Sequence, residues 1–170
     1  MWLGLSPLLD KITYQEVLVL GARVAVSESA RDLGVVIDRE LSLTAHVSAV
    51  CQSGYYLLCQ LRPIVRSLSV HATKTLVQAF ISCRLDYCNS LLYGISNGLL
   101  RRLQSVQNAA ARDHITPVRQ QLHWLPVRQW IVFEVAGLVH QSLAGVTPAY
   151  LADDLPAVTC RPSPAAVGFQ

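Results

Sequence analysis

Hydrophobic residues alternate with polar ones along the first forty residues, which is the spacing of short β-strands. The alternating positions are Val17, Val19, Val24, Val26, Leu33, Val35 and Ile37. Gly21 separates the first two pairs and suits a hairpin turn, and Gly34 allows close approach of the backbone in the last segment. The pattern predicts three short strands that form a small antiparallel β element over residues 14–38.

From Ser42 onward the hydrophobic positions recur every three or four residues, as on one face of an α-helix. Ser42 is expected to cap the first helix, and Pro63 is expected to kink or stop it. The second helix is expected to begin near Ser69 or Val70 and to end at Gly94. The inward positions of these two helices are Val47, Val50, Cys51, Leu58, Leu61, Val65, Thr73, Val77, Phe80, Ile81, Leu85, Cys88 and Leu92.

Two further helices complete the pattern, and the fourth is expected to begin at Pro126 and to end at Gly145. Their inward positions are Leu99, Leu103, Val106, Ala110, Val127, Ile131, Val135, Leu138 and Ser142. The fold class is therefore mainly α, with a helical bundle over residues 42–145 after the β element. Residues 146–170 are expected to form a short helix and a loose tail that is rich in Pro, Ala and Ser.

The composition is that of a single domain with an unusually high content of hydrophobic residues. The chain has 170 residues, of which 52% are hydrophobic and only 15% charged, and its mean hydropathy is +0.35. Such a chain is expected to pack against something else, including a second copy of itself through exposed apolar surface. The formal net charge of +3 permits a nucleic-acid partner, although a dedicated nucleic-acid binder is usually more basic.

Cysteine usage and hydropathy favour an intracellular chain, in the cytoplasm or nucleus. The five cysteines include no C-x-x-C pair, and their odd number argues against a secreted disulfide framework. The N-terminus lacks a positive region and a small-residue cleavage site, so it is a poor signal peptide. The uncharged stretch from Leu41 to Leu61 contains several polar residues, and an amphipathic helix explains it better than a membrane span.

One motif could hold a metal ion. The sequence YLADDL contains the pair Asp153 and Asp154, and polymerases use such paired carboxylates to bind two metal ions. That pair belongs on a tight hairpin between hydrophobic strands, whereas here it follows Pro148 and precedes Pro156. A third carboxylate on another strand is also missing, so we favour a short helix that ends in solvated acids.

The remaining candidate residues have structural explanations as well. In ISCRLDYCNSLLYGIS, Cys83 and Cys88 are five residues apart and fall on different helix faces, so they do not form a metal pair. The five histidines are scattered, and no phosphate-binding glycine motif is present, so no cofactor is expected. The segment LHWLPVRQW, residues 122–130, could stack on bases, but a Trp-rich helix junction is more often core.

The one part of the sequence that is enriched in basic residues lies between residues 101 and 128, where the basic residues are all arginines. They are Arg101, Arg102, Arg112, Arg119 and Arg128. Either they form a solvated helix face, or they contact the phosphates of a nucleic acid.

Several segments, taken in order, resemble the C-terminal part of a reverse transcriptase. They are ARDLGVVID from residue 30, LTAHV from 43, CRLDYCNSLLYG from 83, LQSVQNAAAR from 103, and DHITPV with LHWLPVRQ between 113 and 129. The resemblance is to non-LTR, LINE-type retrotransposons, closest to the chicken-repeat and jockey-like clades. It covers roughly Glu16 to Asp154, and the order of separate motifs makes it specific.

The resemblance implies roles for two regions. The segment from Leu33 to Asp38 would be the primer grip at the edge of the palm, which makes Leu33 and Gly34 candidate nucleic-acid contacts. The helices after it would be a thumb that cradles the template–primer duplex, with Arg101, Arg102, Arg112 and Arg128 as candidate contacts to RNA or an RNA–DNA duplex.

The departures from the family imply a chain without catalysis of its own. Met1 falls inside the end of the palm, so the strands with the catalytic carboxylates would lie upstream. Between Arg112 and Asp113 the family carries several more residues, basic ones included. Three hypotheses follow. The first is a non-catalytic thumb fragment that binds nucleic acid, and the second is an active RNA-directed DNA polymerase. The third is a helical interaction protein, or a retroelement-derived chain with no selected function. We favour the first.

Overall fold

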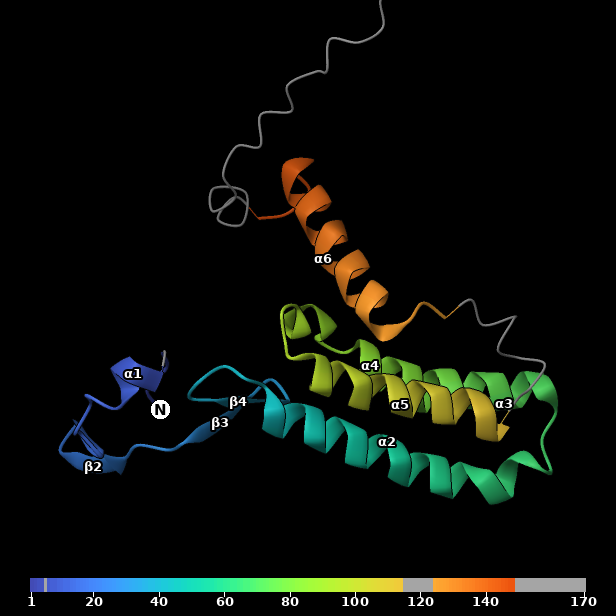
Figure 1. Ribbon diagram of the computed structural model, residues 1–170, viewed down its shortest axis with the longest axis horizontal. Coiled ribbons are helices and arrows are strands. Elements are labelled where there is room, and N and C mark those ends of the chain that lie inside the picture. Colours follow the sequence, from blue (N-terminus) through green and yellow to red (C-terminus); the bar gives the residue numbers. More distant parts are fainter. Residues whose placement is uncertain (5, 115–123, 149–170) are drawn as a thin grey trace, which may run out of the picture.

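The computed structural model describes residues 1–4, 6–114 and 124–148. Two small β-hairpins occupy the N-terminal region, and a bundle of helices follows them (Figure 1). The predicted fold class, mainly α with a small N-terminal β element, is confirmed. None of the described helices combines the length and apolar character needed to cross a bilayer. The predicted short helix and tail after residue 148 lie outside the described residues.

A one-turn helix, α1 (Ser6–Leu9), precedes the hairpins. The first hairpin pairs β1 (Glu16–Val19) with β2 (Ala22–Ala25), and the second pairs β3 (Ser29–Asp32) with β4 (Val35–Asp38). Both pairs are antiparallel, and the hairpins do not join into one sheet. The prediction of three strands was wrong, because β3 has the sequence SARD with no hydrophobic alternation and is exposed throughout.

Each hairpin closes through a two-residue turn with positive φ at both positions. Leu20 and Gly21 have φ of 50° and 85°, and Leu33 and Gly34 have φ of 44° and 86°. These signs define the type I′ turn, whose twist matches that of the flanking strands. The turn at Gly21 was predicted, but the placement of Leu33 within a strand was wrong. Leu33 is a turn residue and is 82% exposed.

The longest helix, α2 (Thr44–Val65), begins one residue later than the predicted cap at Ser42 implies. Its N-cap is Leu43, held at φ 56°, and not Ser42. Ser42 lies one residue before the cap: its hydroxyl donates to the Asp38 carboxylate at 3.0 Å and accepts the N–H of Thr44, the first helical residue, at 3.3 Å. Pro63 lies in the last turn, where the helix does end as predicted.

The predicted second helix is broken into four pieces. They are α3 (Val70–Val77), the π-turn η1 (Gln78–Ser82), α4 (Cys83–Asp86) and the 3₁₀ turn η2 (Asn89–Leu92). Its start was predicted correctly, because the Ser69 hydroxyl caps α3 by accepting the Ala72 N–H at 3.2 Å.

Backbone geometry explains where that prediction failed. The α-helical run ends at Asp86, because Tyr87 leaves the helical region with ψ 116° and Cys88 follows in the left-handed conformation at φ 55°. Phe80 was predicted to face inward but is 43% exposed, and it lies in the π-turn, where the inserted residue changes the helical register.

The core lies between α2, the α3–α4 segment and α5 (Asn97–His114). All four inward positions predicted for α5 are buried. Gly54 of α2 faces Val106 of α5, so these two helices approach closely there. The helix α6 (Val127–Leu143) packs on η2 and α5 through the buried Val127 and Ile131 and then leaves the bundle (Figure 1).

One inward position predicted for α6 was wrong. Leu138 is 48% exposed, although it lies on the same side of the helix as Val127 and Ile131. It follows the two turns that contact η2 and α5, so no neighbouring helix covers it.

Candidate nucleic-acid interface

The structure places the six predicted contact residues in two separate locations. Leu33 and Gly34 form the β3–β4 turn, which lies beside α4. Arg101, Arg102 and Arg112 lie on α5, and Arg128 begins α6. All four arginines are exposed.

The β3–β4 turn is held by Tyr87, at the end of α4. The Tyr87 hydroxyl donates a hydrogen bond to the Leu33 carbonyl oxygen. The Tyr87 ring also lies 3.6 Å from the position that a Cβ on Gly34 would occupy. That distance is ordinary van der Waals contact, so the close backbone approach predicted at Gly34 is not what requires glycine there; its positive φ is.

A hollow of about 460 Å³ lies between this turn, α2 and α4. Its polar lining residues are Arg31, His46, Ser53, Arg84 and Tyr87. The His46 Nδ1 accepts the Val36 N–H at 3.4 Å, and burial lowers the pKa of the His46 imidazole below its ordinary value. The ring is therefore neutral at pH 7, and its Nε2 carries the proton.

The arginines of α5 point in two directions. Arg101 and Arg112 are eleven residues apart, which is three helical turns, so they share the ridge opposite the buried side of the helix. Along the axis this separation is about 16.5 Å. Arg102 is turned toward α2, where its Nη1 donates to the Ser48 hydroxyl at 3.2 Å.

The structure adds Arg128 to the start of this ridge. Its guanidinium donates to the Asn97 side-chain oxygen. Asn97 precedes Arg101 by one helical turn, so the two side chains are neighbours on the same face. We refer to Arg101, Arg112 and Arg128 as the basic ridge. Among the side chains that the structure describes, no carboxylate lies within ion-pair distance of any of them.

Charge is divided unevenly along the chain. Between residues 44 and 143 there are nine Lys or Arg and three Asp or Glu, a formal charge of +6. Residues 1–43 carry four Lys or Arg and six Asp or Glu, a formal charge of −2. The helical region is therefore more basic than the net charge of +3 indicates. This division of charge can be counted from the sequence alone.

The aromatic segment at the start of α6 belongs to the core, as favoured from the sequence. Trp124 and Trp130 are partly buried against the core cluster. The Trp124 indole N–H also donates to the Gln78 side-chain oxygen at 3.4 Å. Both rings therefore contribute to the packing between α6 and the rest of the bundle.

The described residues include no group of three or more His, Cys, Asp or Glu that could hold a metal ion. Cys83 is exposed and Cys88 is partly buried, so they do lie on different faces. Asp153 and Asp154 lie outside the described residues, as do Arg119 and His123.

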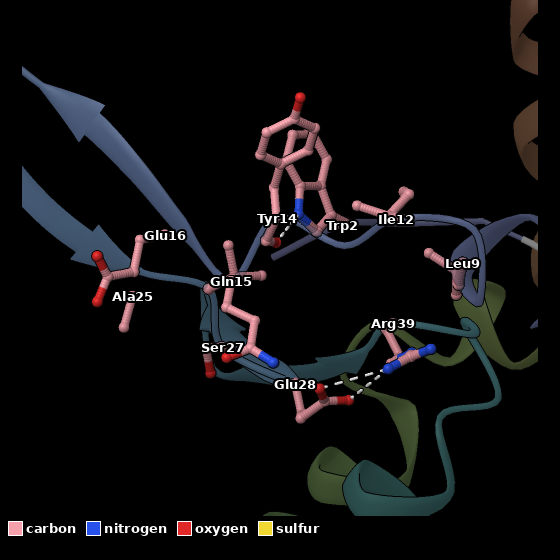
Figure 2. Close-up of a pocket in the computed structure, with 11 residues that line it drawn as sticks. Trp2, Leu9, Ile12, Tyr14, Gln15, Glu16, Ala25, Ser27, Glu28 and Arg39 are labelled. Carbon is pink, nitrogen blue, oxygen red and sulfur yellow. Dashed lines mark hydrogen bonds and ion pairs between the residues drawn. The ribbon is translucent and has the colours of Figure 1, made fainter.

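A second hollow, of about 370 Å³, lies in the N-terminal region (Figure 2). The Trp2 indole N–H donates to the Tyr14 carbonyl oxygen at 3.3 Å on one side. Arg39 on the other side pairs with Glu28 at 3.1 Å and Asp10 at 3.7 Å. Because its arginine is already neutralised, this hollow is a weaker candidate for binding an anion.

The structure also reveals candidates that the sequence reasoning missed. Arg31 and Arg84 line the hollow beside the β3–β4 turn, and Tyr87 forms its wall. No local pattern joins these residues, because they come together only when the second hairpin packs on α2 and α4. No family model, curated protein or solved structure matches the chain.

Proposed function

We propose that this chain is a non-catalytic, thumb-side part of a LINE-type non-LTR reverse transcriptase, and that it contacts RNA or an RNA–DNA duplex inside the cell. The order of the sequence motifs supports the proposal. So does the order of elements, since a turn at Leu33 and Gly34 is followed directly by a bundle of helices.

The basic ridge is the observation that carries the proposed contact. Its arginines have no carboxylate partner among the side chains that the structure describes, and they belong to a region of formal charge +6. An arginine guanidinium is planar and binds phosphate oxygens in pairs, so it suits the backbone of a nucleic acid. The exposed side chains of Ser105 and Asn108 lie between Arg101 and Arg112 and supply neutral hydrogen-bonding groups.

We expect the double variant Arg101→Gln, Arg112→Gln to bind an RNA–DNA duplex with a weaker salt dependence. Each arginine that contacts a phosphate releases a counterion, so losing both lowers the slope of log K against log salt by about two. The measurement is filter retention of a labelled duplex over a series of salt concentrations, with wild type and variant compared.

Arg23→Gln is the matched control. Arg23 is exposed in the first hairpin and pairs with Glu16 at 3.6 Å, so its loss leaves the slope unchanged. Wild-type protein that retains duplex without any salt dependence, or not at all, would contradict the proposed contact. Metal-dependent primer extension by the pure chain would overturn the non-catalytic part of the proposal.

A second candidate function is self-association through α6. Its outward face carries Val132, Ala136, Val139 and Leu143, which are spaced by four, three and four residues. That is the spacing of a coiled-coil seam. The four seam residues are uncharged, so two copies of the chain can pack together here without like charges meeting. The surface of α5 is less suited to self-association, because its arginines would face the arginines of the second copy. We therefore assign the α6 face to a second copy of the chain.

The double variant Val132→Lys, Val139→Lys tests this candidate. We expect the wild-type chain to sediment as a dimer at high concentration, and the variant to sediment as a monomer because two lysines are brought into a neutral seam. Leu18→Lys, on an exposed position of the first hairpin, is the control and should leave the dimer intact. A monomeric wild type over the whole concentration range would rule this function out.

A further inference from the structure

The hollow beside the β3–β4 turn holds two arginines that come from distant segments. Arg31 lies on β3 opposite Val36 of β4, and both residues line the hollow. Arg84 reaches the same hollow from α4. Neither arginine has an ion-pair partner among the described residues. Two like charges that share one hollow, with no carboxylate among its lining residues, favour an anionic ligand.

The carboxylates nearest in sequence do not neutralise these two arginines. Asp86, on α4, accepts a hydrogen bond from the Asn89 side-chain amide at 3.1 Å. Asp32 follows Arg31 on β3 and forms no ion pair with it, although its negative charge lies close enough to Tyr87 to help raise the pKa of the Tyr87 hydroxyl. Neither acid lines the hollow.

Neutral groups complete the lining. His46 presents a ring whose Nδ1 is already bonded to the Val36 N–H, which leaves the Nε2 proton as its free donor. Ser53 adds a hydroxyl from α2, and the same helix contributes two apolar lining residues, Ala49 and Val50. The Tyr87 ring lines the hollow as well, and its hydroxyl is held by the hydrogen bond to the Leu33 carbonyl oxygen.

We propose that this hollow binds the phosphate of a nucleotide, with Arg31 and Arg84 on the phosphate and the nucleoside against Tyr87. Its volume of about 460 Å³ suits a ligand of that size. A nucleobase stacks readily on a tyrosine ring. The inference goes beyond the duplex contact proposed above, because it uses none of the arginines of α5 or α6.

The first test is a titration of the ¹⁵N-labelled full chain with AMP, followed by the amide resonances of Gly34 and Ser53. We expect saturable shifts with AMP and none with adenosine, because the phosphate is the group that the arginines hold. The double variant Arg31→Gln, Arg84→Gln is expected to lose at least tenfold in AMP affinity. Both side chains are exposed, and an unchanged amide spectrum of the variant will show that it still folds.

Two further experiments are needed. One distinguishes a nucleic-acid end from a free nucleotide as the ligand, and the other distinguishes binding in this hollow from duplex binding at the basic ridge. Tighter binding of a 5′-phosphorylated trinucleotide than of AMP would identify a nucleic-acid end as the ligand, and equal binding would identify the free nucleotide. The Arg101→Gln, Arg112→Gln variant should bind AMP like wild type, even if duplex binding fails altogether. Absence of saturable AMP shifts, or an equal affinity in the Arg31→Gln, Arg84→Gln variant, would overturn the inference.

Discussion

Replacing Leu103 with alanine is expected to lower the free energy of unfolding by about 2–5 kcal/mol. Leu103 lies in the middle of α5, is 1% exposed and belongs to the core cluster shared by the helices. The substitution removes buried methyl groups and leaves a cavity that rigid helices fill only in part. Urea unfolding followed by circular dichroism measures the loss as a lower midpoint at an unchanged slope.

Leu91→Ala is the matched control for this prediction. Leu91 is 53% exposed on the 3₁₀ turn η2, so the same chemical change should alter stability by about 0.5 kcal/mol or less. Equal losses for the two variants would mean that the helices around Leu103 do not form one close-packed core.

Replacing Gly54 with alanine is expected to destabilise the chain by about 1–3 kcal/mol, although alanine is the better helix former. A Cβ at this position would lie 2.7 Å from Val106 Cγ1, well inside van der Waals contact. Valine is stiff at χ1 inside a helix, so the methyl group cannot turn aside without moving α5. Urea unfolding again gives the measurement.

Two companion variants separate the clash from helix propensity. Gly137 lies within α6 with nothing within 4 Å of its Cβ position, so Gly137→Ala should stabilise the chain by about 0.5–1 kcal/mol. In a Val106→Ala background the clashing methyl is gone, and Gly54→Ala should then cost nothing. If Gly54→Ala remains destabilising there, the close approach of α2 to α5 at Val106 is not its cause.

The helical part of the fold was predictable because its local signals agree with its tertiary packing. The inward spacing of α5 places four residues in the core, and all four are buried there. The start of α3 was predictable for a similar reason, since Ser69 needs only the backbone of its own first turn to act as a cap.

The errors fall where tertiary contacts override local pattern. The break after α4 is made by Tyr87, which has a non-helical ψ, and by Cys88, whose positive φ is one for which cysteine has no intrinsic preference, so the sequence does not predict it. Strand β3 has no hydrophobic alternation and is defined only by its pairing with β4. Leu33 alternates correctly with Val35 yet lies in the turn, because pairing register is set by the turn as well as by pattern.

The candidate interface also contains residues that the sequence predicts and residues that only tertiary packing brings together. Helical periodicity alone places Arg101 and Arg112 on one outward ridge, so their role as candidates could be stated from the sequence. The addition of Arg128 depends on how α6 docks beside Asn97, which periodicity does not reveal. Arg31 and Arg84 are more than fifty residues apart and meet only through the docking of the second hairpin.

Arginine modification with and without an RNA–DNA duplex tests the central claim most directly, because it identifies the contacting side chains in the unaltered chain. Phenylglyoxal labelling read by peptide mass spectrometry should show Arg101, Arg112 and Arg128 protected by the duplex. Arg23, in the first hairpin, should be modified at the same rate in both samples. Equal modification of the three ridge arginines with and without duplex would contradict the account.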